Sequence, residues 1–275
     1  AHLAAIKGRV PFINFFDGFR TSHEIQKVEV MDYDELAPLI DQKALAAFRA
    51  RALNPDHPVI RGTAENPDVY FQHCEAANPF YNALPDIVQD YMDKISKITG
   101  RSYHLFDYYG APDADRIVIA IGSVTDICKD VTDALNAHGE KVGVLNVHLY
   151  RPFSVKHFLS QIPETVKKIA VLDRTREPGA IGEPLYLDVV SAIASSGRSI
   201  KVCGGRYGLG SKDTPPSSVF AIYTELEKAD PKPRFTIGIT DDVTNLSLPE
   251  VKPAPITSAP VSYTHLRAHE TSQDL

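Results

Sequence analysis

Alternating apolar and polar segments divide residues 106–248 into strands and helices that follow one another in regular order. Residues 116–122 form a short run rich in β-branched side chains, which predicts a strand buried on both faces. Apolar residues then recur at helical spacing over 124–135, and residues 141–149 form a second apolar strand. A strand, a helix and a strand within about thirty residues make one βαβ unit, so we expect a parallel sheet.

The same alternation continues towards residue 248. It predicts three further strands and three further helices, the strands at 168–173, 200–203 and 234–239 and the helices at 153–159, 185–194 and 217–228. Residues 103–115 are predicted to be a connecting segment, with 110–114 as the link between two domains. This order predicts an α/β fold with an open, mostly parallel sheet and helices on both faces.

Residues 1–105 follow a less regular pattern. A helix is predicted at 1–7, a second at 33–53 that is broken at Pro38, and an amphipathic third at 84–99 that ends at Gly100. Two apolar runs, at 10–16 and 27–30, predict strands, whereas residues 54–82 are predicted to be a long irregular loop.

Composition and charge exclude several classes of protein. The 275 residues are 43% hydrophobic and 23% charged, so a core can form, and the net charge of -6 argues against a general nucleic-acid binder. No apolar run reaches the length of a membrane span. The three cysteines, Cys74, Cys128 and Cys203, are far apart, and we interpret them as buried neutral thiols because clusters and zinc sites need a closed set of ligands. We therefore predict no nucleic-acid or membrane partner and no metal site.

Two groups of polar residues lie where strands are predicted to end, which is where α/β proteins place their sites. The first is the loop 17–24, and the second follows the predicted strands at 168–173 and 200–203. We expect both groups to contact a cleft, another domain or a dimer partner, and we expect their cations to be paired. A plain structural loop with internal caps and ion pairs is the alternative. The candidates are Asp17, Arg20, Thr21, His23, Glu24, Arg174, Arg206, Lys212 and Asp213.

Short motifs do not name a reaction. Ser123 and Asp126 predict a capping box at a helix start, and the Gly122–Ser123 turn there is a weak candidate for binding an anion. Residues 204–210 carry four glycines but match neither a dinucleotide fingerprint nor a phosphate loop, so tight turns are the favoured interpretation. The charges at 173–177 predict a salt-bridged interface loop rather than paired catalytic carboxylates.

Longer stretches carry a specific resemblance. Eight of them resemble pyruvate:ferredoxin (flavodoxin) oxidoreductases: FFDGFRTSHE at 15–24, RGTAENPD at 61–68, EAANP at 75–79, GRSY at 100–103, LYRPF at 149–153, VLDRTREPG at 171–179, PLYLDV at 184–189 and GRYGLGSK at 205–212. The resemblance covers roughly residues 1–250. It implies that 1–105 is the closing part of a pyrimidine-side thiamine diphosphate domain and that 106–248 is similar to the C-terminal domain of transketolases.

Enzymes of this family decarboxylate pyruvate on thiamine diphosphate, pass electrons through 4Fe–4S clusters to ferredoxin or flavodoxin, and transfer the acetyl unit to coenzyme A. The resemblance implies that the residues binding substrate, thiamine diphosphate, Mg2+ and clusters lie outside this stretch, so no catalytic, cofactor-binding or metal residue is assigned here and the piece alone is expected to be inactive. The implied partners are the remaining domains of the parent chain, a homodimer partner, and ferredoxin or flavodoxin. The implied location is the cytoplasm of an organism living at least partly without oxygen.

Three alternatives stay open. The first is another 2-oxoacid:acceptor oxidoreductase, the second a non-catalytic binding or assembly module, and the third a nucleotide-binding Rossmann protein, against which the missing glycine fingerprint argues. Residues 249–259 are predicted to be a linker, and residues 260–275 resemble a translated sequencing adapter and are excluded from the fold. We expect the chain to be a fragment of a longer protein.

Overall fold

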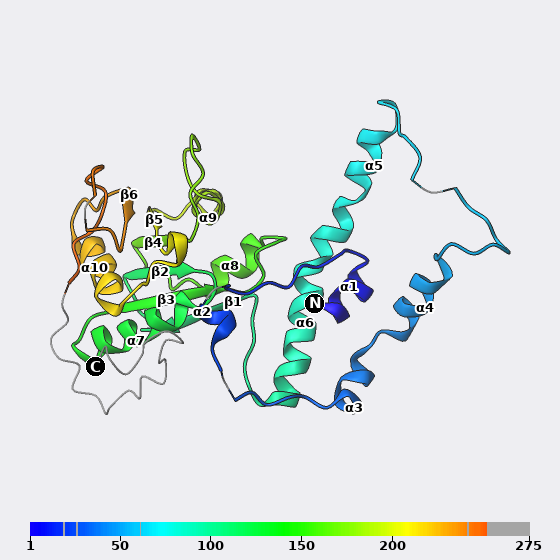
Figure 1. The fold of residues 1–275 in the computed structure, drawn as a ribbon, viewed down its shortest axis with the longest axis horizontal. Coiled ribbons are helices and arrows are strands. Elements are labelled where there is room, and N and C mark those ends of the chain that lie inside the picture. The colour runs from blue at the N-terminus through cyan, green and yellow to red at the C-terminus, as the bar shows by residue number, and fades with distance from the viewer. Residues whose placement is uncertain (19, 26, 61, 241, 252–275) are drawn as a thin grey trace. The chain divides into compact units, whose positions relative to one another are not determined.

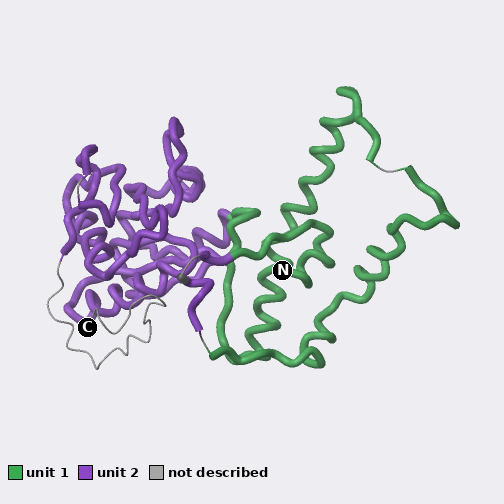
Figure 2. The backbone as a smooth tube through the Cα atoms, viewed as in Figure 1, with its two compact units in different colours: residues 1–15, 27–105, 149–154 green, residues 16–26, 106–148, 155–275 purple. Residues whose placement is uncertain are grey.

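The computed structural model describes residues 1–251 apart from 19, 26, 61 and 241, and of Arg20 it describes only the backbone. Most of the predicted linker and all of the predicted tail at 260–275 therefore lie outside the described residues. Two compact units share the chain (Figure 2). Unit 1 comprises residues 1–15, 27–105 and 149–154, and unit 2 comprises 16–26, 106–148 and the residues from 155 onward.

Unit 1 is built from helices (Figure 1). Helix α1 packs against the long helix α6, where Lys7 Nζ lies 3.3 Å from a carboxylate oxygen of Asp90. None of the described helices in either unit combines the length and the apolarity that crossing a membrane requires. The elements of unit 1 are α1 (His2–Gly8), α3 (Tyr33–Leu36), the 3-10 helix η1 (Ala37–Leu39), α4 (Gln42–Ala50), α5 (Tyr70–Ala76) and α6 (Asn78–Thr99).

Three predictions for this region are wrong. The apolar runs at 10–16 and 27–30 form no strands, and their side chains are largely exposed, with Ile13 at 86% and Val28 at 70%. A strand needs a neighbour for its backbone groups, and neither run has one among the described residues. The predicted irregular loop at 54–82 contains α5 and the first turn of α6. The predicted helix break at Pro38 is confirmed, because η1 separates α3 from α4.

Unit 2 contains a six-stranded sheet in the order β1-β3-β2-β4-β5-β6. Strand β1 runs antiparallel to β3, and every other neighbouring pair is parallel, which confirms the predicted α/β class. Ile117 of β2 lies opposite Gly143 of β3 and Ile169 of β4, so the apolar strands are paired on both sides. The strands are β1 (Phe106–Gly110), β2 (Arg116–Ala120), β3 (Val142–Val147), β4 (Lys168–Asp173), β5 (Lys201–Arg206) and β6 (Arg234–Thr236).

Helices cover both faces of the sheet. Val118 and Ala120 of β2 face the core shared with α7 and α10, and the alternate residues Ile117 and Ile119 point to the other face. On that other face α9 packs against β4 and β5, and α8 packs against β1. The helices of unit 2 are α2 (Arg20–His23), α7 (Val124–Ala137), α8 (Val155–Gln161), α9 (Pro184–Ser196), the 3-10 helix η2 (Leu209–Ser211) and α10 (Pro216–Glu227).

Two details of unit 2 differ from the predictions. Strand β1 lies inside the segment predicted to be a connection, because an edge strand is half-exposed and Asp107 interrupts its apolar pattern. Gly204 and Gly205 lie within β5 rather than in a turn. The ring of Phe235 in β6 occupies the place where a Cβ on Gly205 would stand, 2.4 Å from the nearest ring carbon, so this glycine serves packing between strands.

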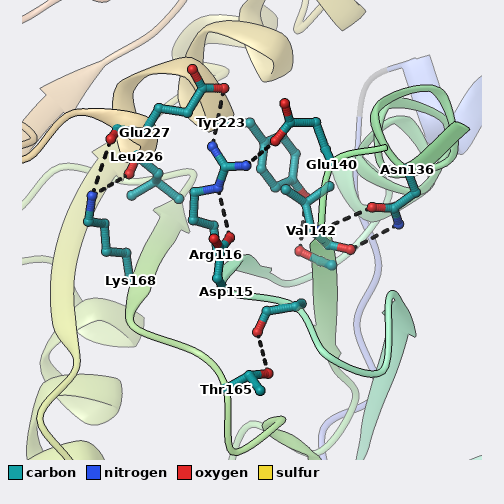
Figure 3. A network of polar contacts seen from close by, with 12 residues as sticks. Asp115, Arg116, Asn136, Glu140, Val142, Thr165, Lys168, Tyr223, Leu226 and Glu227 are labelled. Atoms are coloured by element: carbon teal, nitrogen blue, oxygen red, sulfur yellow. Dashed lines mark hydrogen bonds and ion pairs between the residues drawn. The ribbon is translucent and has the colours of Figure 1, made fainter. Parts of the chain in front are cut away.

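A closed polar network joins the amino-terminal ends of the parallel strands (Figure 3). Arg116 is 8% exposed and pairs with three carboxylates: Asp115 at 2.9 Å, Glu227 at 3.1 Å and Glu140. Lys168 donates to the backbone carbonyls at the end of α10, including that of Leu226 at 2.8 Å. These contacts tie β2 and β4 to α10, so structural interactions occupy the amino-terminal end of the sheet.

Candidate functional site

At the opposite end of the sheet, where the parallel strands have their carboxyl ends, lies a segment from far upstream in the sequence. Residues 16–26 belong to unit 2, and the side chain of Asp17 contacts the residue before α7, Ser123. One oxygen of its carboxylate accepts hydrogen bonds from the backbone N–H of Ser123 at 2.7 Å and from the Ser123 hydroxyl at 2.5 Å. Ser123 is the N-cap residue of α7, as predicted, but the capping box is wrong, because the Ser123 hydroxyl bonds to Asp17 and makes no cap bond within its own helix. A carboxylate 106 residues away serves the helix start instead.

Arg174 completes the surroundings of Asp17. Its Nη1 lies 3.5 Å from Asp17 Oδ1, and its Nε donates to the carbonyl of Gly208 at 3.0 Å. Burial raises the pKa of Asp17, but the hydrogen bonds from Ser123 and the charge of Arg174 outweigh it, so the net pKa is lowered. The site thus holds Asp17 as a carboxylate.

Asp17 and Arg174 both lie against glycines. A Cβ at Gly122 would stand 2.7 Å from Asp17 Oδ2, and one at Gly208 would stand 2.9 Å from Arg174 Nε. Both glycines also have left-handed backbones, with φ of 82° and 65°, that other residues adopt only with strain. The two positions therefore require glycine for space and for conformation.

A small pocket of about 170 Å3 lies beside this cluster. Most of the predicted site residues meet here, since Thr21, Glu24, Arg174, Lys212 and Asp213 all line it. Ser123, from the turn predicted to be a weak anion-binding candidate, also lines the pocket. Five further residues of its wall were not predicted, two in the first turn of α7 and three in the segment after β5: Val124, Ile127, Tyr207, Ser211 and Thr214. Burial raises the pKa of the Tyr207 phenol, so this residue stays neutral.

The remaining predicted residues lie elsewhere or outside the description. His23 is exposed, its Nδ1 lies 3.0 Å from the Ser22 hydroxyl, and it does not line the pocket. The side chain of Arg20 lies outside the described residues. The expected pairing of cations holds for Arg174 and Arg206, whereas no ion pair is found for Lys212 within the described part of the chain.

Arg206 belongs to a second cluster, also at the carboxyl ends of the parallel strands. Its Nη1 lies 3.3 Å from the carboxylate of Glu183, which is buried and also pairs with Arg234. Arg234 donates to the carbonyl of Ile181 at 2.8 Å and lies 4.6 Å from the centre of the Tyr186 ring. The loop after β4 is thus held at its base while Ile181 itself is 89% exposed. Glu183 and Arg234 were not predicted, because only the fold brings the start of α9 close to strand β6.

Asp173, at the end of β4, serves as a cap rather than in the predicted charged interface. Its two carboxylate oxygens accept the backbone N–H groups of Leu185 and Tyr186, each at 3.0 Å, at the start of α9. Burial raises the pKa of this carboxyl, and the two hydrogen bonds only partly oppose the increase. Arg176 and Glu177 of the same predicted loop are exposed.

A larger hollow of about 640 Å3 lies beside β1 and the last turn of α7, and its polar side chains already have partners within unit 2. The Tyr109 hydroxyl lies 2.8 Å from both oxygens of Asp133, and Lys141 pairs with Asp113. In the described residues no three potential metal ligands gather. Cys128 and Cys203 are buried, and burial raises their pKa values to about 12 and about 11, whereas Cys74 is exposed. The prediction of buried thiols is thus confirmed for two cysteines and wrong for Cys74.

Comparison with known proteins gives two family models that match in chain order. "Pyruvate flavodoxin/ferredoxin oxidoreductase, thiamine diP-bdg" matches residues 1–93, and "Pyruvate:ferredoxin oxidoreductase core domain II" matches residues 114–219. The pyruvate-flavodoxin oxidoreductase of Enterobacter agglomerans is 63% identical over 249 residues, and the pyruvate:ferredoxin oxidoreductase of Moorella thermoacetica is 57% identical over 252. These matches cover 90% and 92% of this chain but 21% of each relative, so the chain spans about a fifth of their length.

A solved structure also gives a distant match. The 2-oxoglutarate:ferredoxin oxidoreductase of Magnetococcus marinus superposes with a TM-score of 0.38 at 18% identity, over 61% of this chain and 25% of that one. A likeness this distant does not bear on substrate or site.

Proposed function

Because the chain belongs to the pyruvate:ferredoxin (flavodoxin) oxidoreductase family, we propose that the whole protein containing it oxidises pyruvate to acetyl-CoA and CO2 and reduces ferredoxin or flavodoxin. The observation that carries the proposal is the 63% identity over 249 residues with an enzyme of that name. Sequence identity maintained across both units supports a shared reaction better than the fold does, because a fold hosts many functions.

The proposal assigns the cofactors to other parts of the whole protein. Thiamine diphosphate, Mg2+ and 4Fe–4S clusters would be bound there, with coenzyme A as co-substrate, and they would supply the chemistry of decarboxylation and electron transfer. The described residues of this chain do not fit the metal ion or the clusters. No three metal ligands gather among them, and two of the three cysteines are buried in the core of unit 2 as neutral thiols. The 275-residue chain alone is therefore proposed to be inactive.

We further propose that residues 1–105 close the pyrimidine-side thiamine diphosphate domain and that 106–248 form the second domain. Residues 249–259 would be a linker and 260–275 a non-native tail. Asp17 and the neighbouring pocket residues, together with the exposed loop after β4, would contact the remaining domains or a homodimer partner. These pocket residues are Thr21, Glu24, Arg174 and Lys212. The family names of the two matching models support this order of domains. The proposed location is the cytoplasm.

The test is reduction of ferredoxin and of flavodoxin by the whole protein, with pyruvate, coenzyme A and thiamine diphosphate present. We expect reduction that requires pyruvate, and none from the 275-residue chain under the same conditions. Reduction with another 2-oxoacid but not with pyruvate would overturn the substrate. Failure with every 2-oxoacid tested, by a folded protein loaded with its clusters, would overturn the reaction and favour a binding or assembly role.

A further inference from the structure

The carboxylate of Asp17 is bound as a free anion would be. It accepts a backbone N–H and a hydroxyl hydrogen bond from Ser123, and it faces the guanidinium of Arg174 at 3.5 Å. Its side chain is only 18% exposed. A backbone N–H at a helix start, a hydroxyl and a guanidinium are the groups with which proteins hold anions. Here the anion is covalently part of the chain.

The surroundings of this carboxylate are shaped for it. Gly122 leaves room for Asp17 and Gly208 leaves room for Arg174, since a Cβ at either position would come within 3 Å of those side chains. Arg174 is fixed by its bond to the Gly208 carbonyl, so it is held in place on the side facing Asp17. The arrangement therefore involves the turns after β2, β4 and β5, not one helix end alone.

Apolar packing does little to hold the described part of segment 16–26 in place. Its described apolar side chains, Phe16 and Ile25, are 76% and 101% exposed, so they contribute little hydrophobic stabilisation. Yet three residues of the same segment, Gly18, Thr21 and Glu24, form one wall of the 170 Å3 pocket. Asp17 precedes Gly18 in the same segment, so its bonds to Ser123 and Arg174 hold this wall against unit 2.

We propose that Asp17 is a tethered anion that latches the segment 16–26 onto unit 2, and that the pocket exists only while this latch is closed. When the carboxylate leaves Ser123 and Arg174, the wall moves away and the two donors become available to an external anion. The latch makes the segment a strap over the carboxyl edge of the sheet. This inference concerns the chain's own contacts and does not depend on the reaction proposed above.

Hydrogen exchange of the whole protein tests the latch, with peptides that cover residues 16–26 and the first turn of α7. We expect Asp17→Ala and the isosteric Asp17→Asn to speed exchange in both peptides by roughly tenfold or more, because charged hydrogen bonds are lost. Asp32→Ala is the matched control: Asp32 also accepts a backbone N–H at a helix start, from Asp34 at 2.9 Å, but it lies outside the segment. Its substitution should leave both peptides unchanged.

Formate provides the second arm, since it restores a carboxylate without the tether. Excess sodium formate, compared with sodium chloride at the same ionic strength, should slow exchange at the start of α7 in Asp17→Ala but not in the double variant Asp17→Ala with Arg174→Ala. The 16–26 peptide should stay fast, because formate cannot hold the strap. Unchanged exchange in Asp17→Ala, wild-type behaviour of Asp17→Asn, or recovery of the strap peptide with formate would each overturn the proposal.

Discussion

Unit 2 buries most of its large apolar side chains, whereas unit 1 leaves many of its own exposed. In unit 2, Phe106, Phe158 and Phe235 are 0–1% exposed, whereas in unit 1 Phe48 and Phe71 are 61% and 71% exposed. The difference follows from architecture. In unit 2 helices cover both faces of a sheet, whereas in unit 1 the described helices pack mainly through α1, which contacts α6 and α4. Exposed apolar surface of this extent marks regions that other protein covers or that promote aggregation.

The strongest test of this contrast makes the same type of substitution, Phe to Ala, once in each unit. Phe158→Ala in unit 2 removes a fully buried ring that packs edge-on against Phe106, with centroids 5.5 Å apart. It should lower the free energy of unfolding by about 3–5 kcal/mol, measured from hydrogen exchange of the β2 and β4 amides. Phe71→Ala in unit 1 should change the free energy of opening, measured from hydrogen exchange of the α5 and α6 amides, by less than about 0.5 kcal/mol. Equal losses in the two variants would contradict the contrast.

Charged side chains sharpen the same comparison with a smaller effect. Arg116→Met in unit 2 leaves Asp115, Glu140 and Glu227 without their shared guanidinium, and we expect a loss of about 2 kcal/mol in the free energy of unfolding. In unit 1, Lys7→Met removes a half-exposed partner of Asp90 and should cost less than about 0.5 kcal/mol. Urea denaturation of each variant measures both values. A larger loss for Lys7→Met would show that charges matter more in unit 1.

Asp17 gives a prediction with a defined pH window. Its pKa in the folded protein is lowered, so its stabilising contribution is complete above the unfolded value of about 3.9 and is lost as pH falls through the lower folded value. The free energies of unfolding of the wild type and Asp17→Asn should therefore differ by about 1 kcal/mol at neutral pH. The difference should stay constant down to about pH 5 and shrink below pH 4. A difference that grew on acidification would rule out the assigned ion pair.

Thiol labelling gives the smallest effect, and it needs no substitution. Cys74 in unit 1 is exposed, while Cys128 and Cys203 in unit 2 are buried with raised pKa values. At pH 8 the native chain should react rapidly at Cys74 alone, and all three thiols should react once urea unfolds unit 2. Rapid labelling of Cys128 in the native chain would mean that the core of unit 2 opens readily.

Local sequence was sufficient where the structure depends on local pattern. The continuous apolar runs at β2, β3 and β4 predicted buried parallel strands, and the helix that ends at Gly100 follows its own periodicity. Strands at 10–16 and 27–30 were predicted by the same logic and are wrong, because β-branched composition supplies the side chains of a strand but not its partner. The exposed edge strand β1 was missed because it has a pairing partner, β3, but lacks a continuous apolar pattern.

The site was predictable only as an edge of the sheet. Parallel strands bring their carboxyl ends together, so Arg174 and Lys212 could be chosen from loop position alone. Asp17 and Thr21 were chosen because they follow the apolar run at 10–16, which is not a strand. Their partners could not, because Ser123 lies 106 residues from Asp17 and the Gly208 carbonyl lies 34 residues from Arg174. Ser123 was predicted to form a local capping box, but its hydroxyl donates to the distant carboxylate of Asp17 instead.

The order of the strands has a consequence for synthesis on the ribosome. Strand β1 is made first but pairs with β3, whose last paired residue, Val147, emerges only after β2 and α7 have been completed. Until then the nascent β1 carries unpaired backbone groups and two tyrosines, Tyr108 and Tyr109, next to the exposed helices of unit 1 that precede it in the chain. Translational pausing between residues 110 and 147 should therefore increase chaperone binding and premature aggregation more than a pause after β3.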